Sequence, residues 1–376
     1  MATTVLPVRV PYYAVSIGGQ DITPWVAAVQ VVEDDRLADS VTITVNDPRM
    51  IYADALLEGS VAEVDLGYPE KDRHTLLIRA VLTKIDVSYL ENGTPQVKLK
   101  GEDFSIWMGL TEKKKQWKDT TVNAIVRAIA KPYGFADVVA SLSPDPKVIR
   151  EYQGGRTDLA FLQHLARKHA AKCFVELNKD NREVLYFIPE RRVLDLRRAD
   201  KLMLRYRQGP TSNLLTFVPS FDGSYIDRFK QVNDIDDRGQ AVSTRAPALP
   251  DAPVWQLPDD LRSRANPADQ ERIKALHKAG IAARDKLRKA LGAPKPLTGK
   301  VAPTTQQQLD DESKTLASRR QGMSATGSTI GTIWLRAKCH VSISGVHERF
   351  AGDWYVTGVT HTVDSGGYKT DFKAVR

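Results

Sequence analysis

Apolar and polar residues alternate through most of the first 110 residues of this 376-residue chain. In SVTITV (residues 40–45), the valine and isoleucine side chains fall on one face of a strand and the threonines on the other. Similar short stretches recur about every ten residues, with turn residues between them. Asn92-Gly93 separates two of them and favours a tight hairpin, because both residues tolerate positive φ. The pattern predicts a barrel or sandwich of short antiparallel strands.

The period changes between about residue 110 and residue 191, where helices are predicted. Thr120 is a candidate cap for a helix that ends at Pro132 and Gly134. A second helix is predicted to start at Thr157 or Asp158. Its apolar stripe has spacings of three and four, at Leu159, Leu162, Leu165, Ala166 and His169, with Phe161 beside it. KCFVELN and EVLYFIP then predict a hairpin, which completes a small mixed domain.

Strand patterns resume after Arg192 and again beyond Gly327, on either side of an insertion over 246–325. The insertion is rich in proline and alanine, and one helix is predicted within it over 268–292. Apolar and small residues form a narrow seam along this helix, at Ile273, Leu276, Gly280, Ala283, Leu287 and Ala290. Such a seam is suited to close packing against another helix or a barrel.

Composition is that of a soluble globular protein, with 42% hydrophobic and 27% charged residues. Two cysteines are too few for a disulfide framework, which favours folding in a reducing compartment. The N-terminus lacks the basic start of a signal peptide. The net charge is +8, but 14 Lys/Arg against 9 Asp/Glu fall in the insertion, so the rest of the chain is close to balanced.

The pattern of reactive side chains predicts no catalytic, cofactor or metal site. His164 and His169 are five residues apart, so they do not share a helical face as two zinc ligands four apart do. Cys339 and His340 are adjacent in a strand, so their side chains point to opposite faces. His361 is interpreted as a packed strand histidine. There is no G-x-S-x-G, P-loop or dinucleotide-binding motif, and we expect a protein without enzymatic activity.

Two alternatives rest on charged clusters. The basic stretches 112–118, with Trp117, and 190–201 could hold phosphates, which would make the chain a nucleic-acid-binding protein. The acidic clusters Asp34-Asp35 and 310–312 could serve a baseplate-associated peptidoglycan hydrolase. Both acidic clusters have loop-like polar surroundings, where carboxylates are expected to be solvated.

Four stretches resemble one known family. Residues 152–189 resemble the signature of the phage late control protein D family, in which an aspartate and Leu/Ala-Phe-Leu open a helix that a hairpin follows. Residues 18–48 resemble the start of its first barrel, 209–221 the start of its second, and 345–372 its closing hairpin. The family comprises baseplate hub proteins of contractile tails and the hub part of type VI secretion spike proteins.

The resemblance implies an α+β fold that is mainly β: two tube-like antiparallel β-barrels joined by a small mixed α/β domain, with a helical insertion in the second barrel. The domains expected are 1–110 for the first barrel, 111–191 for the mixed domain, 192–245 with 326–376 for the second barrel, and 246–325 for the insertion.

The function implied is that of a structural hub, a homotrimeric adaptor between a hexameric tail tube and a trimeric spike. The expected partners are further copies of the chain, the tail tube protein, the spike protein and other baseplate proteins. No membrane is expected as a partner, and DNA is expected only as cargo passing through the channel. The expected location is the tail baseplate of the virion, after assembly in the host bacterial cytoplasm.

The same resemblance assigns structural roles to residues. The core of the family motif is expected at Asp158, Leu159, Phe161, Leu162 and Leu165, with His164 on the surface. In the insertion, contact with an acidic baseplate partner is expected at Arg272, Lys278, Arg284 and Arg288. A channel that lets DNA slide should not carry rings of cations, so three basic stretches should face away from it: 113–118, 191–201 and 272–289.

Overall fold

The computed structural model describes residues 10–70, 74–89, 91–169, 171–190, 192–193, 202–221, 231–235, 241–245, 257, 265–290, 297–298 and 323–376. The chain forms two compact units. The first unit comprises residues 1–219 and 325–374, and the second comprises 220–324 with the last two residues.

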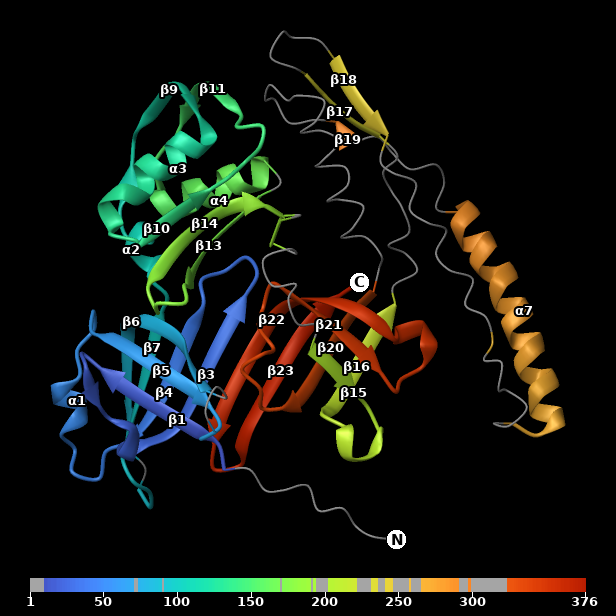
Figure 1. Cartoon of the computed structure of the whole chain (residues 1–376), viewed down its shortest axis with the longest axis horizontal. Helices are drawn as coiled ribbons and strands as arrows, with labels where there is room; N and C mark the ends of the chain where they lie inside the picture. Colours follow the sequence, from blue (N-terminus) through green and yellow to red (C-terminus); the bar gives the residue numbers. More distant parts are fainter. Residues whose placement is uncertain are drawn as a thin grey trace. The chain divides into compact units, whose positions relative to one another are not determined.

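The N-terminal part of the first unit is a curved antiparallel sheet (Figure 1). Its elements are β1 (Tyr12–Ile17), β2 (Gln20–Asp21), η1 (Thr23–Trp25), β3 (Val26–Asp34), β4 (Ser40–Asn46), α1 (Tyr52–Ala55), β5 (Val61–Gly67), β6 (His74–Ser88) and β7 (Gln96–Glu102). In β4 the valines and isoleucine are buried and the residues between them are half-buried, as the alternation predicted. The hairpin predicted at Asn92-Gly93 is confirmed, because β6 and β7 pair with Ser88 opposite Gln96.

The mixed domain, expected over 111–191, packs two longer helices against a small sheet, and a short helix before residue 111 contributes Met108 to the same core. Its elements are α2 (Ile106–Gly109), β8 (Glu112–Lys113), β9 (Gln116–Thr121), α3 (Val122–Ala130), η2 (Lys131–Tyr133), β10 (Asp137–Ala140), β11 (Lys147–Tyr152), β12 (Arg156–Thr157), α4 (Asp158–Lys168), β13 (Ala171–Leu177) and β14 (Glu183–Pro189). The predicted hairpin is confirmed, since β13 and β14 pair antiparallel. The prediction of Thr120 as a helix cap is wrong by one residue. Thr120 pairs with Val148 between β9 and β11, and the Thr121 hydroxyl accepts the Ala124 amide at 3.3 Å.

Thr157 caps α4, because its Oγ1 accepts a hydrogen bond from the Ala160 amide at 3.2 Å. We expect Thr157→Ala to lower the free energy of unfolding by about 1 kcal/mol, the usual cost of losing an N-cap. Thr157→Ser keeps the hydroxyl and should lose less than half of that. Urea unfolding of the three proteins measures the difference, and equal losses in both variants would show that the cap contributes nothing.

The C-terminal β region continues the N-terminal sheet. Its elements are β15 (Leu202–Arg205), η3 (Gly209–Thr211), β16 (Leu214–Phe221), β20 (Met323–Ile330), β21 (Cys339–Ser344), η5 (Glu348–Phe350), β22 (Gly352–Asp364) and β23 (Gly367–Val375). The first half of β22 pairs with β21, and its second half pairs with β3, with Gly358 opposite Asp34. One 13-stranded sheet therefore runs through both regions, in the order β16-β20-β23-β22-β3-β4-β7-β6-β5-β1-β2, with β21 on β22 and β15 on β21.

The strand pairings in this sheet test the predicted architecture. The mainly β, α+β class is confirmed. No pairing among the described strands closes either β region into a separate barrel. The long strand β22 instead links the two regions, and Val363 and Tyr368 from the C-terminal region pack into the same hydrophobic core as the N-terminal strands.

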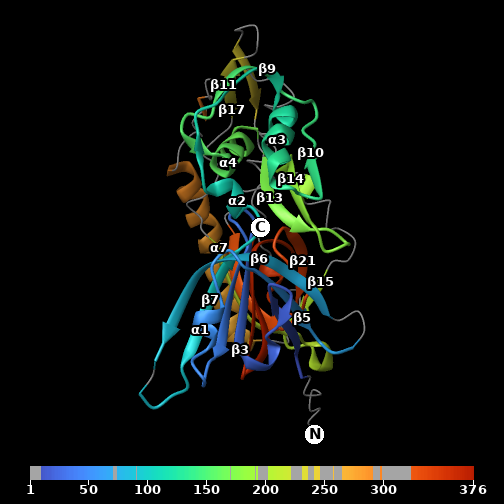
Figure 2. The same ribbon diagram turned by 90° about the vertical axis from the view of Figure 1, so that its left-hand side faces the viewer.

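The mixed domain has a hydrophobic core of its own. The motif residues Phe161, Leu162 and Leu165 are fully buried in it, and Leu159 packs at its edge. Both views place α3, α4, β13 and β14 together, to one side of the large sheet of the first unit (Figure 1, Figure 2). The first unit thus has two cores, and the contacts between them decide how the mixed domain is held.

The second unit contains β17 (Gln231–Ile235), β18 (Ala241–Arg245), β19 (Leu297–Thr298) and the long helix α7 (Pro267–Ala290). The helix predicted over 268–292 is confirmed as far as residue 290, and its last two predicted residues lie outside the described part. The Asn266 side chain begins it by accepting the Asp269 amide at 2.9 Å. Among the described helices, none is both long and apolar enough to cross a membrane.

Candidate functional site

The histidines and cysteines singled out in the sequence analysis lie apart from one another or are packed in the interior. His164 is half-buried, with Nε2 3.9 Å from Glu151, and His169 follows the last turn of α4. Cys339 is buried, and its thiol lies 2.8 Å from the Arg336 carbonyl oxygen. Among the described residues, no three ligating side chains gather in a way that could hold a metal ion.

The motif aspartate organises the start of α4. Asp158 is 2% exposed, and its carboxylate accepts hydrogen bonds from Lys113 Nζ at 2.5 Å, Tyr133 Oη at 2.7 Å and Gln153 Nε2 at 2.7 Å. Burial alone would raise the pKa of Asp158, but these donors outweigh it and hold the pKa below its usual value. The carboxylate therefore stays charged and ties β8, η2 and the residue after β11 to the helix.

Two lysines of the basic stretch 113–118 also make contacts within the domain. Lys113 is bound to Asp158, and the Lys115 ammonium lies 3.8 Å from the centre of the Trp117 ring. Trp117 itself packs against the core of the mixed domain. Of the basic stretch 191–201, only residues 192 and 193 are described.

A cluster of buried charged side chains lies where three parts of the first unit meet, and we call it the junction. Glu33 is the next-to-last residue of β3 and lies opposite a residue of β22. Arg336 and Lys338 precede β21, and Glu176 belongs to β13 of the mixed domain. Arg336 forms an ion pair with Glu33 and lies 3.8 Å from Glu176. Lys338 is 2% exposed and lies 3.1 Å from Glu176 and 3.9 Å from Asp39. Glu33 also accepts the Ala337 amide at 3.0 Å.

Two further contacts attach the same hairpin to the sheet. Lys172 of β13 is 5% exposed and forms an ion pair with Asp35, and its Nζ lies 2.7 Å from the Tyr355 hydroxyl. Arg79 of β6 donates to Glu183 of β14 at 2.6 Å. The expectation that Asp35 is solvated is wrong, because β13 covers the end of β3 and buries this carboxylate.

Burial shifts the pKa values of several groups in the junction. Burial, and then the nearby carboxylates of Glu176, Glu33 and Asp103, raise the pKa of Asp39 well above its usual value against the effect of Lys338. Burial alone would lower the pKa of Arg336, but Glu33 and Glu176 outweigh it and raise that pKa. Burial lowers the pKa of His361, which packs behind Glu33, to about 4.

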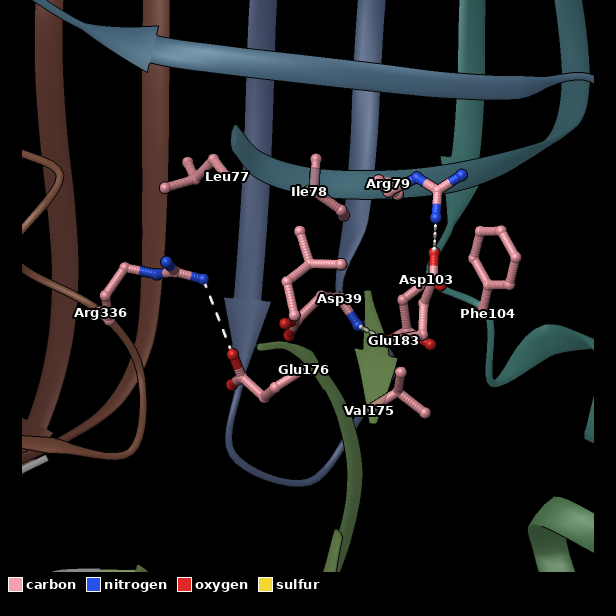
Figure 3. A pocket seen from close by; sticks show the side chains of 11 residues that line it. Asp39, Leu77, Ile78, Arg79, Asp103, Phe104, Val175, Glu176, Glu183 and Arg336 are labelled. Atoms are coloured by element: carbon pink, nitrogen blue, oxygen red, sulfur yellow. Dashed lines mark hydrogen bonds and ion pairs between the residues drawn. The ribbon is translucent and has the colours of Figure 1, made fainter. Parts of the chain in front are cut away.

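A small pocket opens beside these side chains, as Figure 3 shows. Arg336 faces Glu176 at one end of the pocket, and Arg79 faces Glu183 at the other. The pocket has room for little more than a water molecule, which excludes a sugar or a nucleotide from it. The Glu176 and Glu183 carboxylates at its two ends are held by cations. The junction is therefore suited to fixing the mixed domain on the sheet rather than to acid–base chemistry.

Sequence reasoning missed the junction. Ala337 and Glu33 are 304 residues apart, and Lys338 and Glu176 are 162 apart, so no local motif joins them. The one available signal was the i, i+4 spacing of Lys172 and Glu176, which places two opposite charges on one face of a strand otherwise rich in apolar residues.

Comparison with known proteins found similar structures but no matching sequence family. No family model matches the sequence, and no curated protein matches it. The 43 kDa tail protein of prophage MuSo2 from Shewanella oneidensis superposes with a TM-score of 0.63 at 13% identity, covering 97% of this chain and 98% of that one. A tail protein from Neisseria meningitidis gives a TM-score of 0.63 at 15% identity, covering 97% and 96%.

The chain has the fold of phage tail proteins. A third similar structure is an Escherichia coli component of the type VI secretion system, described as structurally similar to bacteriophage T4 tail proteins gp27 and gp5. Its TM-score is 0.56 at 12% identity, and the match covers 96% of this chain and 76% of that one. At these identities the similarity concerns the fold alone.

Proposed function

We propose that the chain is the structural baseplate hub of a contractile phage tail or tail-like particle, of the late control protein D type. The observation that carries this proposal is the similarity of fold over nearly the whole length of two tail proteins. The similarity to a type VI secretion component supports it, because the hub part of type VI spike proteins is included in the family that residues 152–189 resemble. The hub joins a hexameric tail tube to a trimeric spike, and DNA passes through it only as cargo.

A trimer is supported by the ends of the sheet. In the described part of the chain, β16 ends the sheet with β20 as its neighbour, and the exposed residues of β16 include Leu215 and Val218. Unpaired, apolar strand edges aggregate unless another chain or element covers them. Three copies arranged around an axis would cover such an edge in a closed ring, which an open assembly cannot do.

Mass measurement and imaging test the hub role. We expect size-exclusion chromatography with light scattering to give three copies per particle, either for the chain alone or after addition of a candidate spike protein. A particle image should show three copies at the end of the tail tube, within the baseplate assembled in the host cytoplasm. Six separate copies or a single copy would contradict the proposal.

The same samples distinguish the alternatives. A hydrolase would clear peptidoglycan in a zymogram, and a nucleic-acid-binding protein would bind DNA with a steep dependence on salt. In the particle image, the basic stretches 113–118, 191–201 and 272–289 should lie away from the channel. If most of them lined it, the nucleic-acid-binding alternative would be favoured.

A further inference from the structure

The helix α7, orange in Figure 1, carries an apolar seam that the structure leaves largely uncovered. Leu276 is 66% exposed and Leu287 is 45% exposed, although both are large apolar residues. Between them, a side chain at Gly280 would meet no atom within 4 Å, and Ala283 is exposed. From Ile273 onward, the half-buried residues are Ile273, His277, Ile281 and Arg284, an adjoining face that shares only Ile273 with the seam. The seam from Leu276 to Leu287 is therefore exposed and available for a partner.

The spacing of the seam is that of a coiled coil. Ile273, Leu276, Gly280, Ala283, Leu287 and Ala290 alternate steps of three and four, which places them at the a and d positions of successive heptads. The small residues Gly280 and Ala283 let a second helix approach closely at the centre, while the two leucines offer apolar contacts on either side.

The flanking charges identify the kind of partner. The positions beside the seam, e and g, hold Arg272, Arg284 and Lys286, and every charged residue at these positions over residues 267–290 is a cation. The acids Glu271 and Asp285 both lie at f, on the far side of the helix, and the third acid, Asp269, lies at the d position before Ile273, paired with Arg272 of its own helix. A second copy of α7 would place cations at e and g against cations, whereas a helix with glutamates at its own e and g positions would pair with them.

We propose that α7 forms a coiled coil with an acidic amphipathic helix of another protein. Leu276 and Leu287 bury against apolar residues of that helix, and Arg272 and Lys286 pair with its glutamates. Arg272 is well placed for this, because its side chain is 75% exposed and its ion pair with Asp269 is a surface contact at 3.5 Å. The proposal goes beyond the hub role and does not depend on it.

Synthetic helices test the charge rule on the full chain, with fluorescence anisotropy as the readout. One peptide carries leucine at a and d with glutamate at e and g, and the other carries lysine in place of glutamate. We expect the acidic peptide to bind at least about tenfold more tightly, and added salt to reduce the difference. Equal binding of the two peptides, or no binding of the acidic one, would overturn the proposal.

Matched variants distinguish pairing at the flanks of the seam from a general effect of the helix's net charge. Arg272→Glu with Lys286→Glu should remove or reverse the preference, whereas Lys278→Glu with Lys289→Glu makes the same charge change at f and c and should leave it within about twofold. Leu276→Asp with Leu287→Asp should abolish binding of both peptides. Circular dichroism checks that helix content is kept, and an equal loss in both glutamate pairs would contradict pairing at the flanks of the seam.

A spin label on Ala283→Cys tests other occupants, with the labelled wild-type chain as background because Cys339 is buried and Cys173 partly so. We expect the label to be mobile in the isolated chain and immobilised by the acidic peptide. A label that is immobile at every protein concentration would show that the same chain covers the seam. Immobilisation that grows with concentration would show that a second copy does. Either result would overturn the proposal, and neither bears on binding to tube or spike.

Discussion

Replacing Arg336 with methionine is expected to lower the free energy of unfolding of the first unit by about 3–5 kcal/mol. The guanidinium forms an ion pair with Glu33, which is 1% exposed, so its removal leaves a buried carboxylate without its main cation. Methionine keeps much of the side-chain length, which limits the cavity that the substitution creates. Urea unfolding followed by tryptophan fluorescence measures the loss, because Trp354 is fully buried in the same unit.

Two controls show whether the loss comes from the buried charge. Lys84→Met breaks an exposed ion pair with Asp86, at 2.7 Å, and should cost much less than Arg336→Met. Adding Glu33→Gln to Arg336→Met removes the unpaired charge while keeping an acceptor for the Ala337 amide, so the double variant should regain stability. A loss in Arg336→Met no larger than in Lys84→Met would refute the role of the junction.

The junction connects the two cores of the first unit. The hairpin β13–β14 meets the large sheet through three ion pairs: Lys172 with Asp35 just after β3, Glu176 with Lys338 just before β21, and Glu183 with Arg79 in β6. Ion pairs with fixed partners specify one orientation, whereas a flat apolar contact allows several.

The sequence predicted elements that depend on local pattern. The strands of the N-terminal region, the hairpins at 92–93 and 178–182, the helix from Asp158 and the helix α7 all follow from spacing and turn residues. The cap at Thr121 was missed by one residue because Thr120 and Thr121 are both competent caps, and the choice depends on where β9 ends.

Such local patterns do not predict which distant strands pair with each other. The joining of the two β regions depends on β22 reaching both β21 and β3, and alternation along β22 is the same whichever strand lies beside it. The burial of Asp35 likewise depends on β13, which is more than a hundred residues away in the chain. In each case the sequence pattern indicates which residues are buried in a strand but not which distant element covers them.

Stability is expected to fall by about 3 kcal/mol through His361 alone as the pH is lowered from 7 to 4. Burial lowers the pKa of His361 from 6.5 to about 4 in the folded chain, so between these values the unfolded state takes up a proton that the folded state does not. The contribution is complete above pH 6.5 and is lost progressively as the pH falls to 4. Asp39 has the opposite sign, because its pKa is raised in the folded chain and protonation there favours the fold, so the whole curve does not isolate the histidine.

Comparison of variants isolates the pH-dependent contribution of His361. His361→Gln can keep a hydrogen bond to the Tyr368 hydroxyl, which lies 2.8 Å from Nδ1, but it cannot titrate. We therefore expect this variant to be less stable than the wild type at pH 7, and the gap to narrow by about 3 kcal/mol at pH 4. His347→Gln, at an exposed position, should follow the wild type throughout. Urea unfolding at half-unit pH steps measures the three curves, and a gap that stays constant with pH would mean that His361 takes up its proton equally in the folded and unfolded states.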